Sequence, residues 1–451
     1  MQLRGQKYSI IGGARSGIAA AKLLKSHGAE VFLSDKAPAE KMQQAIAELS
    51  RHNIAHEFGG NTEKVLQADV VVLSPGVSSD VPLVKQALAK GLKVVSEIEV
   101  ASWFCTGSIV GITGTNGKTT TTTLVGRIFE DAKKPSVVAG NIGVAFSEVV
   151  ERVTEESTAI LEISSFQLDT VDTFRPKVSA LLNITPDHLD RYEHSMEKYI
   201  ASKCRIFENQ RGGDTIVYNY DDTLVRTNVE KRVHPEVKKL PFSTKMKLAE
   251  GAFVEDKKLL TRIDGKQTEV IAVDNISIKG IHNLMNAMAA TLAAKAMSIP
   301  TSSLRATLKN FKGVEHRLEF VRELDGVVYV NDSKATNVDS VWYALQSFPK
   351  PIVLLLGGRD KGNDYSQLYQ LVNKHVKAIV AIGESADKVL NAFANMKPVS
   401  KAMNINEAIQ QARGFAASGD VVLLSPACAS FDWFDNYEHR GRVFKEIVSK
   451  F

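Results

Sequence analysis

Cysteine, long apolar runs and clustered positive charge are all scarce in this chain of 451 residues. The three cysteines, Cys105, Cys204 and Cys428, are spaced too widely for a zinc motif, and so small a number favours a reducing compartment. No run of about 18 apolar residues occurs, and the chain enters a predicted strand almost at once. We therefore expect a cytoplasmic protein with no membrane-spanning segment.

Charged residues are numerous but mixed. The chain has 56 Lys and Arg against 51 Asp and Glu, a net charge of +5, and the basic residues form none of the tracts that nucleic-acid-binding proteins carry. Hydrophobic residues make up 44%, and the length corresponds to about three domains of ordinary size. The composition predicts a multidomain globular protein that handles anionic small molecules and not nucleic acid. We expect a monomer, although the composition does not determine the oligomeric state.

Residues 111–120, Gly-Ile-Thr-Gly-Thr-Asn-Gly-Lys-Thr-Thr, predict a phosphate-binding loop. An apolar strand at 108–113 precedes the loop and a helical pattern at 120–129 follows it, so backbone N–H groups can curl around an anion at a helix N-terminus. Lys118 would reach the terminal phosphates and Thr119 would ligate Mg²⁺. A glycine turn with a solvent-exposed lysine is the alternative. The motif predicts ATP or GTP chemistry.

A βαβ pattern opens the chain, with strands at 7–11 and 30–34 around a helix at 18–25. Its glycine turn has Ala14 where the dinucleotide-binding fingerprint has its middle glycine, which weakens a nicotinamide-binding interpretation. Further strands complete a first α/β unit near residue 100, at 70–74 and 92–96.

Two more α/β patterns follow. The second starts with the phosphate loop and has strands at 159–163, 178–183 and 214–218, a polar insertion at 236–275 predicted as short antiparallel strands, and a helix at 280–294. The third starts near residue 313 and has strands at 327–330, 352–356, 378–382 and 420–424. We expect an α/β fold of three domains: a Rossmann-like N-terminal domain (1–100), a central P-loop ATPase-like domain with a mostly parallel sheet (101–313), and a C-terminal Rossmann-like α/β domain (314–451).

Polar residues at strand ends of the second unit fall where a metal beside ATP would need them. Glu162 interrupts the apolar strand 159–163, and a carboxylate there is costly unless it is paired or bound to a metal. A salt-bridged glutamate is the alternative. A second polar cluster, 183–192, contains His188, which taken alone would more often be a structural hydrogen-bonding residue than a ligand.

Eight segments, in order along nearly the whole chain, resemble the Mur ligase family: 114–120, 140–143, 162–168, 183–192, 282–286, 315–318, 331–337 and 425–432. The last one, continuing to 437–441, resembles the D-glutamate-adding members in particular. The resemblance implies that ATP phosphorylates the terminal carboxylate of UDP-N-acetylmuramoyl-L-alanine and that the amine of D-glutamate attacks the acyl phosphate, in peptidoglycan precursor synthesis. Such chemistry needs cations and metals more than a protein nucleophile.

The resemblance implies catalytic roles for Lys118, Glu162, His188, Lys203 and Lys334. Thr119 and Glu162 would hold one Mg²⁺, and His188 with Lys203 would hold a second. Lys203 matches the lysine that is carbamylated in the family; a carbamate can ligate a cation, whereas an ammonium cannot. From the residues alone, Lys203 would be an ordinary solvated helix lysine.

The resemblance also implies binding residues for each substrate. ATP would contact Gly114, Thr115, Asn116, Gly117, Lys118, Thr119, Thr120, Asn283, Asn286, Arg317 and Asp332, with His316 close by. The UDP substrate and D-glutamate would contact Arg15, Ser16, Asp35, Lys36, Gly76, Asn141, Ser164, Gln167, His188, Thr336, Lys361, Ser430, Phe431 and Tyr437, and Arg191 would assist His188. The two asparagines could equally be packing residues on one helix face, and Lys361 a solvated loop charge.

Other functions stay open at this point. A nicotinamide oxidoreductase is supported by the opening βαβ pattern and Asp35. A nucleotide-dependent switch is supported by the phosphate loop, although a guanine-reading N-K-x-D motif is missing. Folylpolyglutamate synthetase and the other murein ligases share the loop, metal and linker motifs, and the carboxy-terminal segment favours the D-glutamate-adding members.

Overall fold

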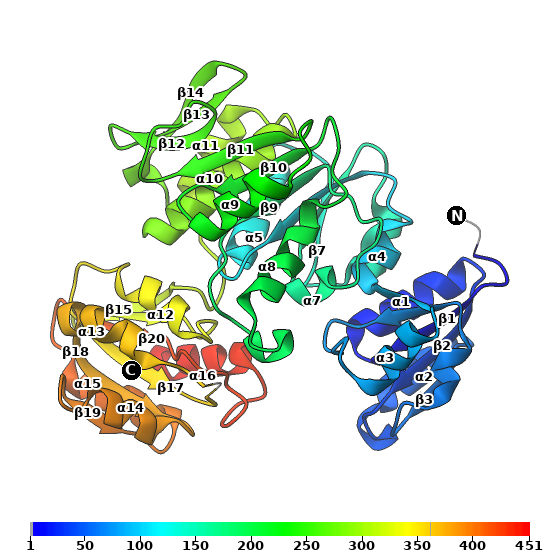
Figure 1. Cartoon of the computed structure of the whole chain (residues 1–451). Coiled ribbons are helices and arrows are strands. Elements are labelled where there is room, and N and C mark those ends of the chain that lie inside the picture. The colour runs from blue at the N-terminus through cyan, green and yellow to red at the C-terminus, as the bar shows by residue number, and fades with distance from the viewer. Residues whose placement is uncertain (1–2, 361) are drawn as a thin grey trace. The chain divides into compact units, whose positions relative to one another are not determined.

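The computed structural model describes residues 3–360 and 362–451, so the predicted acceptor residue Lys361 lies outside the described residues. Three separate sheets succeed one another along the chain (Figure 1). The chain forms two compact units, Met1–Asn275 with Met285–Lys309, and Ile276–Leu284 with Asn310–Phe451. The sheets are mostly parallel, which confirms the predicted three-domain α/β class.

The first sheet is parallel, in the order β3-β2-β1-β4-β5. It comprises β1 (Lys7–Ile11), β2 (Glu30–Asp35), β3 (Ala55–Phe58), β4 (Val70–Leu73) and β5 (Lys93–Ser96), with helices α1 (Arg15–Ser26), α2 (Gln43–Arg51), α3 (Pro82–Ala89) and α4 (Glu97–Ser102). The β1–α1 turn needs Gly17, because a Cβ there would lie 1.9 Å from the Gly12 carbonyl oxygen. Strand order reverses beside β1, the place where open α/β sheets bind ligands.

The central sheet has the order β14-β13-β12-β11-β10-β9-β6-β8-β7. Its strands are β6 (Ser108–Thr113), β7 (Ser136–Gly140), β8 (Thr158–Glu162), β9 (Val178–Leu181), β10 (Thr215–Asn219), β11 (Lys238–Ser243), β12 (Gly251–Glu255), β13 (Lys258–Ile263) and β14 (Lys266–Ala272). The antiparallel prediction for 236–275 is confirmed for β12 to β14 and wrong for β11, which pairs parallel with β10. The reason is α9 (Thr223–Arg232), a helical crossover that returns the chain in the same direction.

Helices of the central region position the loops at the carboxyl edge of this sheet. They are α5 (Lys118–Asp131), α6 (Phe146–Val149), α7 (Ser165–Leu168), α8 (Met196–Cys204), α10 (Ile281–Ala296) and α11 (Thr301–Asn310), with the 3-10 turn η4 (Leu189–Tyr192) before α8. Apolar residues from the strands and from α6, α7 and α8 form one buried cluster beneath these loops.

The third sheet has the order β15-β16-β20-β17-β18-β19, and β15 pairs antiparallel with β16. It comprises β15 (Glu319–Leu324), β16 (Val327–Asn331), β17 (Ile352–Gly357), β18 (Val376–Ile382), β19 (Val399–Lys401) and β20 (Val421–Leu424). Its helices are α12 (Val338–Leu345), α13 (Tyr369–His375), α14 (Ala386–Phe393), α15 (Ile405–Phe415) and α16 (Tyr437–Ser449).

Buried carboxylates on α4 connect the first sheet to the central one. Glu99 accepts hydrogen bonds from Trp103 Nε1 (2.8 Å) and from the backbone N–H groups of Asp172 (2.9 Å), Thr173 (2.9 Å) and Phe174 (2.8 Å). Glu97 accepts from the N–H of Ser147 (2.7 Å), and burial raises the pKa of the Glu97 carboxyl. These contacts fix the end of the first sheet against α6 and the loop before β9.

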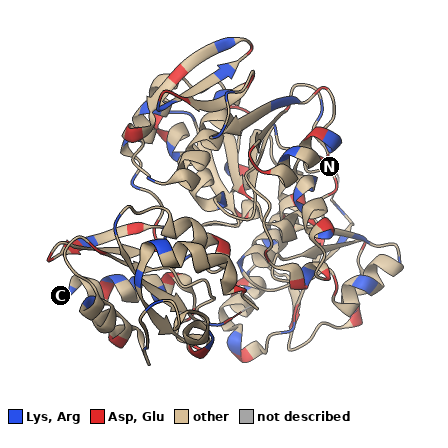
Figure 2. Cartoon of the chain, turned by 60° about the vertical axis from the view of Figure 1, so that its left-hand side comes forward, with Lys and Arg blue, Asp and Glu red and all other residues tan. Residues whose placement is uncertain are grey.

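Basic and acidic residues are interspersed over the elements of both units (Figure 2), as the mixed composition predicts. Within 3–360 and 362–451, no helix has both the length and the apolar character that crossing a bilayer requires.

Candidate active site

The predicted phosphate loop joins β6 to α5 at the carboxyl edge of the central sheet. Gly117 has a φ of +83° and caps α5. A Cβ at Gly117 would lie 2.3 Å from Asn286 Oδ1, so only glycine fits. The first N–H groups of an α-helix have no partner within the helix, and the loop therefore presents them to an anion. Thr119 and Thr120 are buried in this first turn.

Residues after β9 hold the loop in shape. The Asn116 N–H donates to Asn183 Oδ1 (2.7 Å), and Asn183 Nδ2 donates to the Asn116 carbonyl (3.0 Å). Thr115 Oγ1 donates to the Thr185 carbonyl (3.0 Å) and lies 3.1 Å from the hydroxyl of Tyr199. Asn183 was not among the predicted site residues; the only signal for it was its position in the polar cluster after a buried strand.

Two lysines from different helices reach the loop. Lys118 Nζ donates to the carbonyls of Gly114 (2.9 Å) and Thr115 (2.6 Å), and Lys203 Nζ donates to the same Gly114 carbonyl (2.8 Å). Lys203 is 1% exposed, in contrast to a solvated helix lysine. Burial, and then the charge of Lys118, hold the pKa of Lys203 well below its usual value. Lys203 is therefore an amine that gives up its proton readily.

Glu162 ends β8 next to the loop strand, pairing in register with Ile112. Its side chain is buried, and Asn141 Nδ2 donates to Glu162 Oε1 at 2.8 Å. Because β6 and β8 are parallel neighbours, Glu162 and the residues after β6 share one sheet edge. Asn141 thus fixes a buried carboxylate at the edge of the sheet that carries the loop, and carboxylate oxygens are ligands that Mg²⁺ prefers.

His188 and Arg191 meet at the ring of Phe166. His188 has a φ of +52° and begins the η4 turn, and its ring centroid lies 5.2 Å from that of Phe166. The Arg191 guanidinium lies 3.7 Å from the same centroid and donates to the carbonyls of Pro75 (3.3 Å) and Val77 (3.0 Å). Arg191 therefore ties the His188 turn to the loop after β4, which contains Gly76.

Ser164 and Gln167 form a capping box at the start of α7. Gln167 Oε1 accepts from the backbone N–H and hydroxyl of Ser164, each at 3.0 Å, and the Gln167 N–H donates back to Ser164 Oγ at 3.4 Å. These bonds satisfy helix-end groups. Their predicted substrate contacts stay predictions.

Predicted UDP-binding residues lie at the carboxyl edge of the first sheet. Asp35 accepts from the N–H groups of Gly13 (2.5 Å) and Ala37 (2.7 Å), which fixes the turns after β1 and β2. Arg15 and Ser16 begin α1, and Lys36 is exposed.

The predicted adenine residues lie one turn apart on α10. Asn286 is buried, its Oδ1 accepts from Thr121 Oγ1 at 3.3 Å, and it closes the back of the loop at Gly117. Asn283 Nδ2 donates to the Lys279 carbonyl at 2.8 Å.

Asp332 and His316 are buried in the second unit. Asp332 accepts from Ser425 Oγ (2.7 Å) and the Leu318 N–H (3.2 Å), and burial raises the pKa of Asp332 to about 7. Burial, and then the charge of Arg317, lower the pKa of His282 to about 4. His316 Nδ1 lies 2.9 Å from Asn331 Nδ2.

The predicted acceptor residues of this unit come from two segments. Lys334 Nζ lies 5.2 Å from the Tyr437 ring centroid, Ser430 is buried, Phe431 is exposed, and Thr336 is half-buried. Buried Arg440 joins the segments, because it donates to Ser333 Oγ (2.9 Å), the Ser333 carbonyl (2.7 Å) and the Cys428 carbonyl (3.2 Å). Arg440 was missed as a site residue, although it lies in the segment 437–441.

One cluster of acidic and imidazole groups among the described residues could hold a metal with protein ligands alone. It consists of Glu315, His316 and Glu319. Lys445 Nζ already pairs with Glu315 (2.5 Å) and Glu319 (2.9 Å), so one cation offsets part of the negative charge of this cluster.

Family models match three successive parts of the chain. They describe a Mur ligase MurD-like N-terminal domain at residues 6–96, a Mur ligase middle domain at 112–294, and a Mur ligase glutamate ligase domain at 316–428.

Curated relatives match at full length. A protein of Salinibacter ruber named UDP-N-acetylmuramoylalanine–D-glutamate ligase is 49% identical, over 99% of this chain and 98% of its own. Proteins of the same name from Chloroherpeton thalassium (99% and 98%) and Christiangramia forsetii (98% and 99%) are 46% and 44% identical.

Solved structures share the fold. MurF from Acinetobacter baumannii matches with a TM-score of 0.63 at 16% identity, over 99% of this chain and 91% of that one. A pseudomurein peptide ligase type C from Methanothermus fervidus matches with a TM-score of 0.61 at 19% identity, over 99% and 100%. The three matched domains and the full-length relatives together establish that this chain belongs to the Mur ligase family.

Proposed function

We propose that this chain is the ATP-dependent ligase that joins D-glutamate to the L-alanine carboxylate of UDP-N-acetylmuramoyl-L-alanine, releasing ADP and phosphate. The observation that carries this proposal is the 49% identity over 99% of the chain to a relative of that name. Family membership sets aside the oxidoreductase and the regulatory switch. Peptidoglycan precursor synthesis is the process in which such a ligase acts, and we place it in the cytoplasm, as a monomer.

The phosphate loop supplies the ATP chemistry. The N-terminus of α5 offers N–H groups to the phosphates. Lys118, which donates to two loop carbonyls in this structure, is the cation that can reach the same phosphates. Since phosphoryl transfer requires positioning and neutralisation of charge, the site needs these groups together with metal ions and no protein nucleophile. Asn183 holds the loop in shape by bonding to both the N–H and the carbonyl of Asn116.

For the metals, we propose Mg²⁺ at Thr119 and Glu162, and a second Mg²⁺ at His188 and carbamylated Lys203. The Asn141 bond to Glu162 supports the first site, because it leaves a buried carboxylate fixed at the loop edge. The lowered pKa of Lys203 supports the carbamate, because only the neutral amine attacks CO₂. As the N–C bond forms, one C=O π bond of CO₂ opens to give the carbamate oxygen anion, and the proton from nitrogen passes to solvent. A carbamate at Lys203 would attract the Lys118 ammonium, whereas a Lys203 ammonium would repel it.

For the acceptor, we propose that D-glutamate binds through the second unit, at Lys334, Thr336, Lys361, Ser430, Phe431 and Tyr437. The Arg440 hydrogen bonds support this, because they hold the segments of Lys334 and Ser430 together. The UDP end would bind at Arg15, Ser16, Asp35, Lys36 and Gly76, on the edge that Asp35 organises.

Trapping with hydroxylamine tests the reaction order. With ATP, Mg²⁺ and UDP-N-acetylmuramoyl-L-alanine but no amino acid, we expect ADP and a hydroxamate of the substrate, and addition of D-glutamate should replace the hydroxamate by the amide product. Lys118→Ala should lose both products while keeping the wild-type melting temperature, and Lys198→Ala, an exposed lysine paired with Glu193, should lose neither. Wild-type turnover by Lys118→Ala would contradict the loop assignment.

A further inference from the structure

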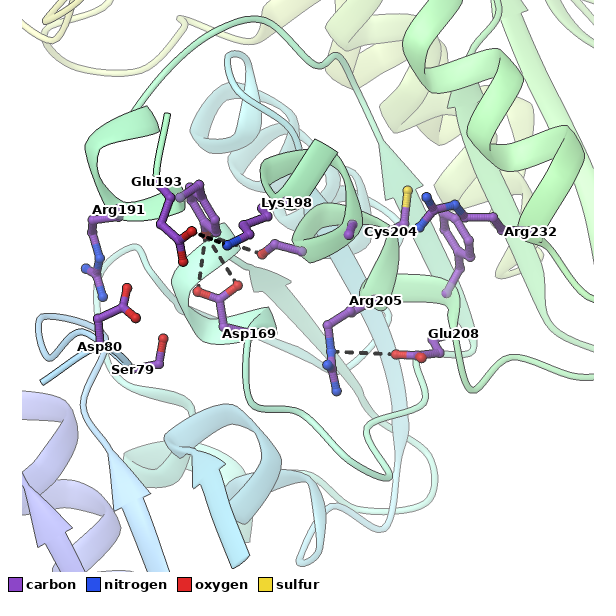
Figure 3. A pocket seen from close by; sticks show the side chains of 14 residues that line it. Ser79, Asp80, Asp169, Arg191, Glu193, Lys198, Cys204, Arg205, Glu208 and Arg232 are labelled. Atoms are coloured by element: carbon purple, nitrogen blue, oxygen red, sulfur yellow. Dashed lines mark hydrogen bonds and ion pairs between the residues drawn. The ribbon is translucent and has the colours of Figure 1, made fainter. Parts of the chain in front are cut away.

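A cavity of about 600 Å³ lies beside α8 and the η4 turn (Figure 3). Its walls come from α8, the η4 turn, the end of α7 and the loop after β4. Several of its charged side chains form ion pairs, as Lys198 does with Glu193 at 2.5 Å and Arg205 with Glu208 at 3.6 Å. Asp169 differs from them because its carboxyl faces inward to a polar cluster.

This cluster consists of Asp169, Tyr192 and Ser202, which come from three different elements. The Tyr192 hydroxyl donates to the Asp169 carboxyl, with distances of 3.2 and 3.4 Å to its two oxygens, and lies 3.3 Å from Ser202 Oγ. Ser202 Oγ donates to the carbonyl of Ser165 at 2.9 Å. Figure 3 shows the Asp169 carboxyl at this point, with dashed hydrogen bonds that reach both of its oxygens. The cluster therefore links α7, η4 and α8 at one point.

Each linked element carries one of the proposed metal ligands or lies within three residues of one. Glu162 ends the strand that leads into α7, His188 begins the turn that Tyr192 closes, and Lys203 follows Ser202 on α8. Neighbouring helix residues point about 100° apart. When the Ser202 hydroxyl bonds into the cluster, the next side chain, Lys203, is turned toward the loop, where its Nζ reaches the Gly114 carbonyl.

Aromatic packing alone would leave this arrangement loosely defined. Tyr192 stacks on Phe166 with centroids 6.2 Å apart and tilts against Tyr199 at 5.3 Å. Such contacts are weakly directional, whereas hydrogen bonds to a carboxyl fix where the Tyr192 hydroxyl lies. Burial raises the pKa of Asp169, and Arg191 and Arg205 oppose that effect. A leucine of similar shape at position 169 would avoid the cost of removing a carboxyl from water. The Asp169 carboxyl therefore serves to orient the Tyr192 hydroxyl more than to stabilise the fold.

We propose that Asp169 is a positioning residue that holds the His188 turn and the Lys203 helix at the spacing from Glu162 that a divalent cation requires. It acts through Tyr192 and Ser202 and does not itself touch substrate. The inference rests on the proposed function for the identity of the metal ligands.

Binding of Mn²⁺, followed by electron paramagnetic resonance in the presence of ADP, tests this role in the full chain. Asp169→Leu should weaken Mn²⁺ binding by about tenfold, as loss of outer-shell partners does. Binding of ADP alone, measured by calorimetry, should not change, because the loop and Lys118 are untouched. Asp169→Asn keeps the shape and an acceptor for Tyr192, so it should retain Mn²⁺ affinity within about twofold.

Smaller substitutions separate positioning from folding. Tyr192→Phe and Ser202→Ala should each weaken Mn²⁺ binding. When either is combined with Asp169→Leu in a double variant, the two losses should not add fully, because all three substitutions break the same cluster. Glu208→Leu is the matched control, since it lines the same cavity outside the cluster and should leave Mn²⁺ affinity unchanged.

The proposal is overturned by wild-type Mn²⁺ affinity in Asp169→Leu, or by an equal loss of Mn²⁺ and ADP binding. If Asp169→Leu does not fold, wild-type Mn²⁺ affinity in both Tyr192→Phe and Ser202→Ala overturns it instead. None of these measurements needs the UDP substrate or D-glutamate. Absence of ligase activity in the unsubstituted chain would therefore count against the proposed function alone.

Discussion

Lys118 and Lys203 donate to one acceptor, the carbonyl oxygen of Gly114, at 2.9 and 2.8 Å. Two ammonium groups on one oxygen repel each other, and Lys203 is also removed from water. Burial and the neighbouring charge of Lys118 lower the pKa of Lys203, which is the property that the proposed carbamate needs. This relationship couples α8 to the phosphate loop and makes the state of Lys203 the most testable feature of the site.

Lys203→Arg should be inactive, because arginine keeps the positive charge but stays protonated and so does not form a carbamate with CO₂. Lys203→Ala should also be inactive and should regain part of its turnover when acetate or formate is added, since a short carboxylate can take the place of the carbamate oxygen. The measurement is ADP release over a series of carboxylate concentrations. An arginine variant as active as the parent would sink the carbamate proposal.

Gly76→Ala should separate substrate binding from stability. A Cβ at Gly76 meets no atom within 4 Å, so the melting temperature and the KM for ATP should not change. The KM for the UDP substrate should rise about tenfold if this exposed loop contacts it, which corresponds to about 1.4 kcal/mol. Gly414→Ala, equally unobstructed but in the second unit, is the control. Unchanged KM for the UDP substrate would remove Gly76 from the site.

Asp332 should make the stability of the second unit depend on pH. The pKa of Asp332 is raised from 3.8 to about 7, so the folded chain binds more protons than the unfolded one between these values. Stability from this group is therefore fully present below about pH 4 and falls as the pH rises to about 7, by at most about 4 kcal/mol. Asp332→Asn should remove the dependence, because its amide can still accept from the Leu318 N–H and donate to Ser425 Oγ.

The melting temperature of Asp332→Asn relative to wild type should thus rise between pH 5 and pH 8. A difference that stays constant across this range would show that the carboxyl does not titrate there.

Lys361→Ala tests the acceptor assignment, which comes from the resemblance because Lys361 lies outside the described residues. A charge-assisted contact to a glutamate carboxylate contributes about 1.5–3 kcal/mol, so the KM for D-glutamate should rise by one to two orders of magnitude. The hydroxamate formed without amino acid should persist. Loss of ATP binding with an unchanged KM for D-glutamate would mean that the residue acts elsewhere.

Local patterns predicted the parts of the fold that are locally determined. Strand β17 is a continuous apolar run, and the loop between β6 and α5 has a recognisable glycine pattern. Both can therefore be predicted from the local sequence. The edge strand β15 was missed because its sequence, Glu-Phe-Val-Arg-Glu-Leu, is half-exposed and contains a register shift. β11 was assigned the wrong direction because strand direction depends on the crossover helix and not on the strand's own residues.

The site residues also separate into those that the local sequence predicts and those that depend on distant contacts. The glycines of the loop are visible in the sequence because backbone conformation demands them, as at Gly117. The burial of Lys203 has no local signature, since it depends on contact with Gly114, which lies 89 positions away. Asn183 and Arg440 were missed for the same reason: each bonds to the backbone of a distant segment, Asn183 to Asn116 and Arg440 to Ser333.

The central claim, addition of D-glutamate, is tested most directly by phosphate release with ATP, Mg²⁺ and UDP-N-acetylmuramoyl-L-alanine across a panel of D- and L-amino acids, with the product identified by mass. We predict that D-glutamate supports sustained release and an amide product, and that L-glutamate, L-alanine and D-aspartate support far less. Sustained release with an L-amino acid but not with D-glutamate would contradict the account and assign the chain to another member of the family.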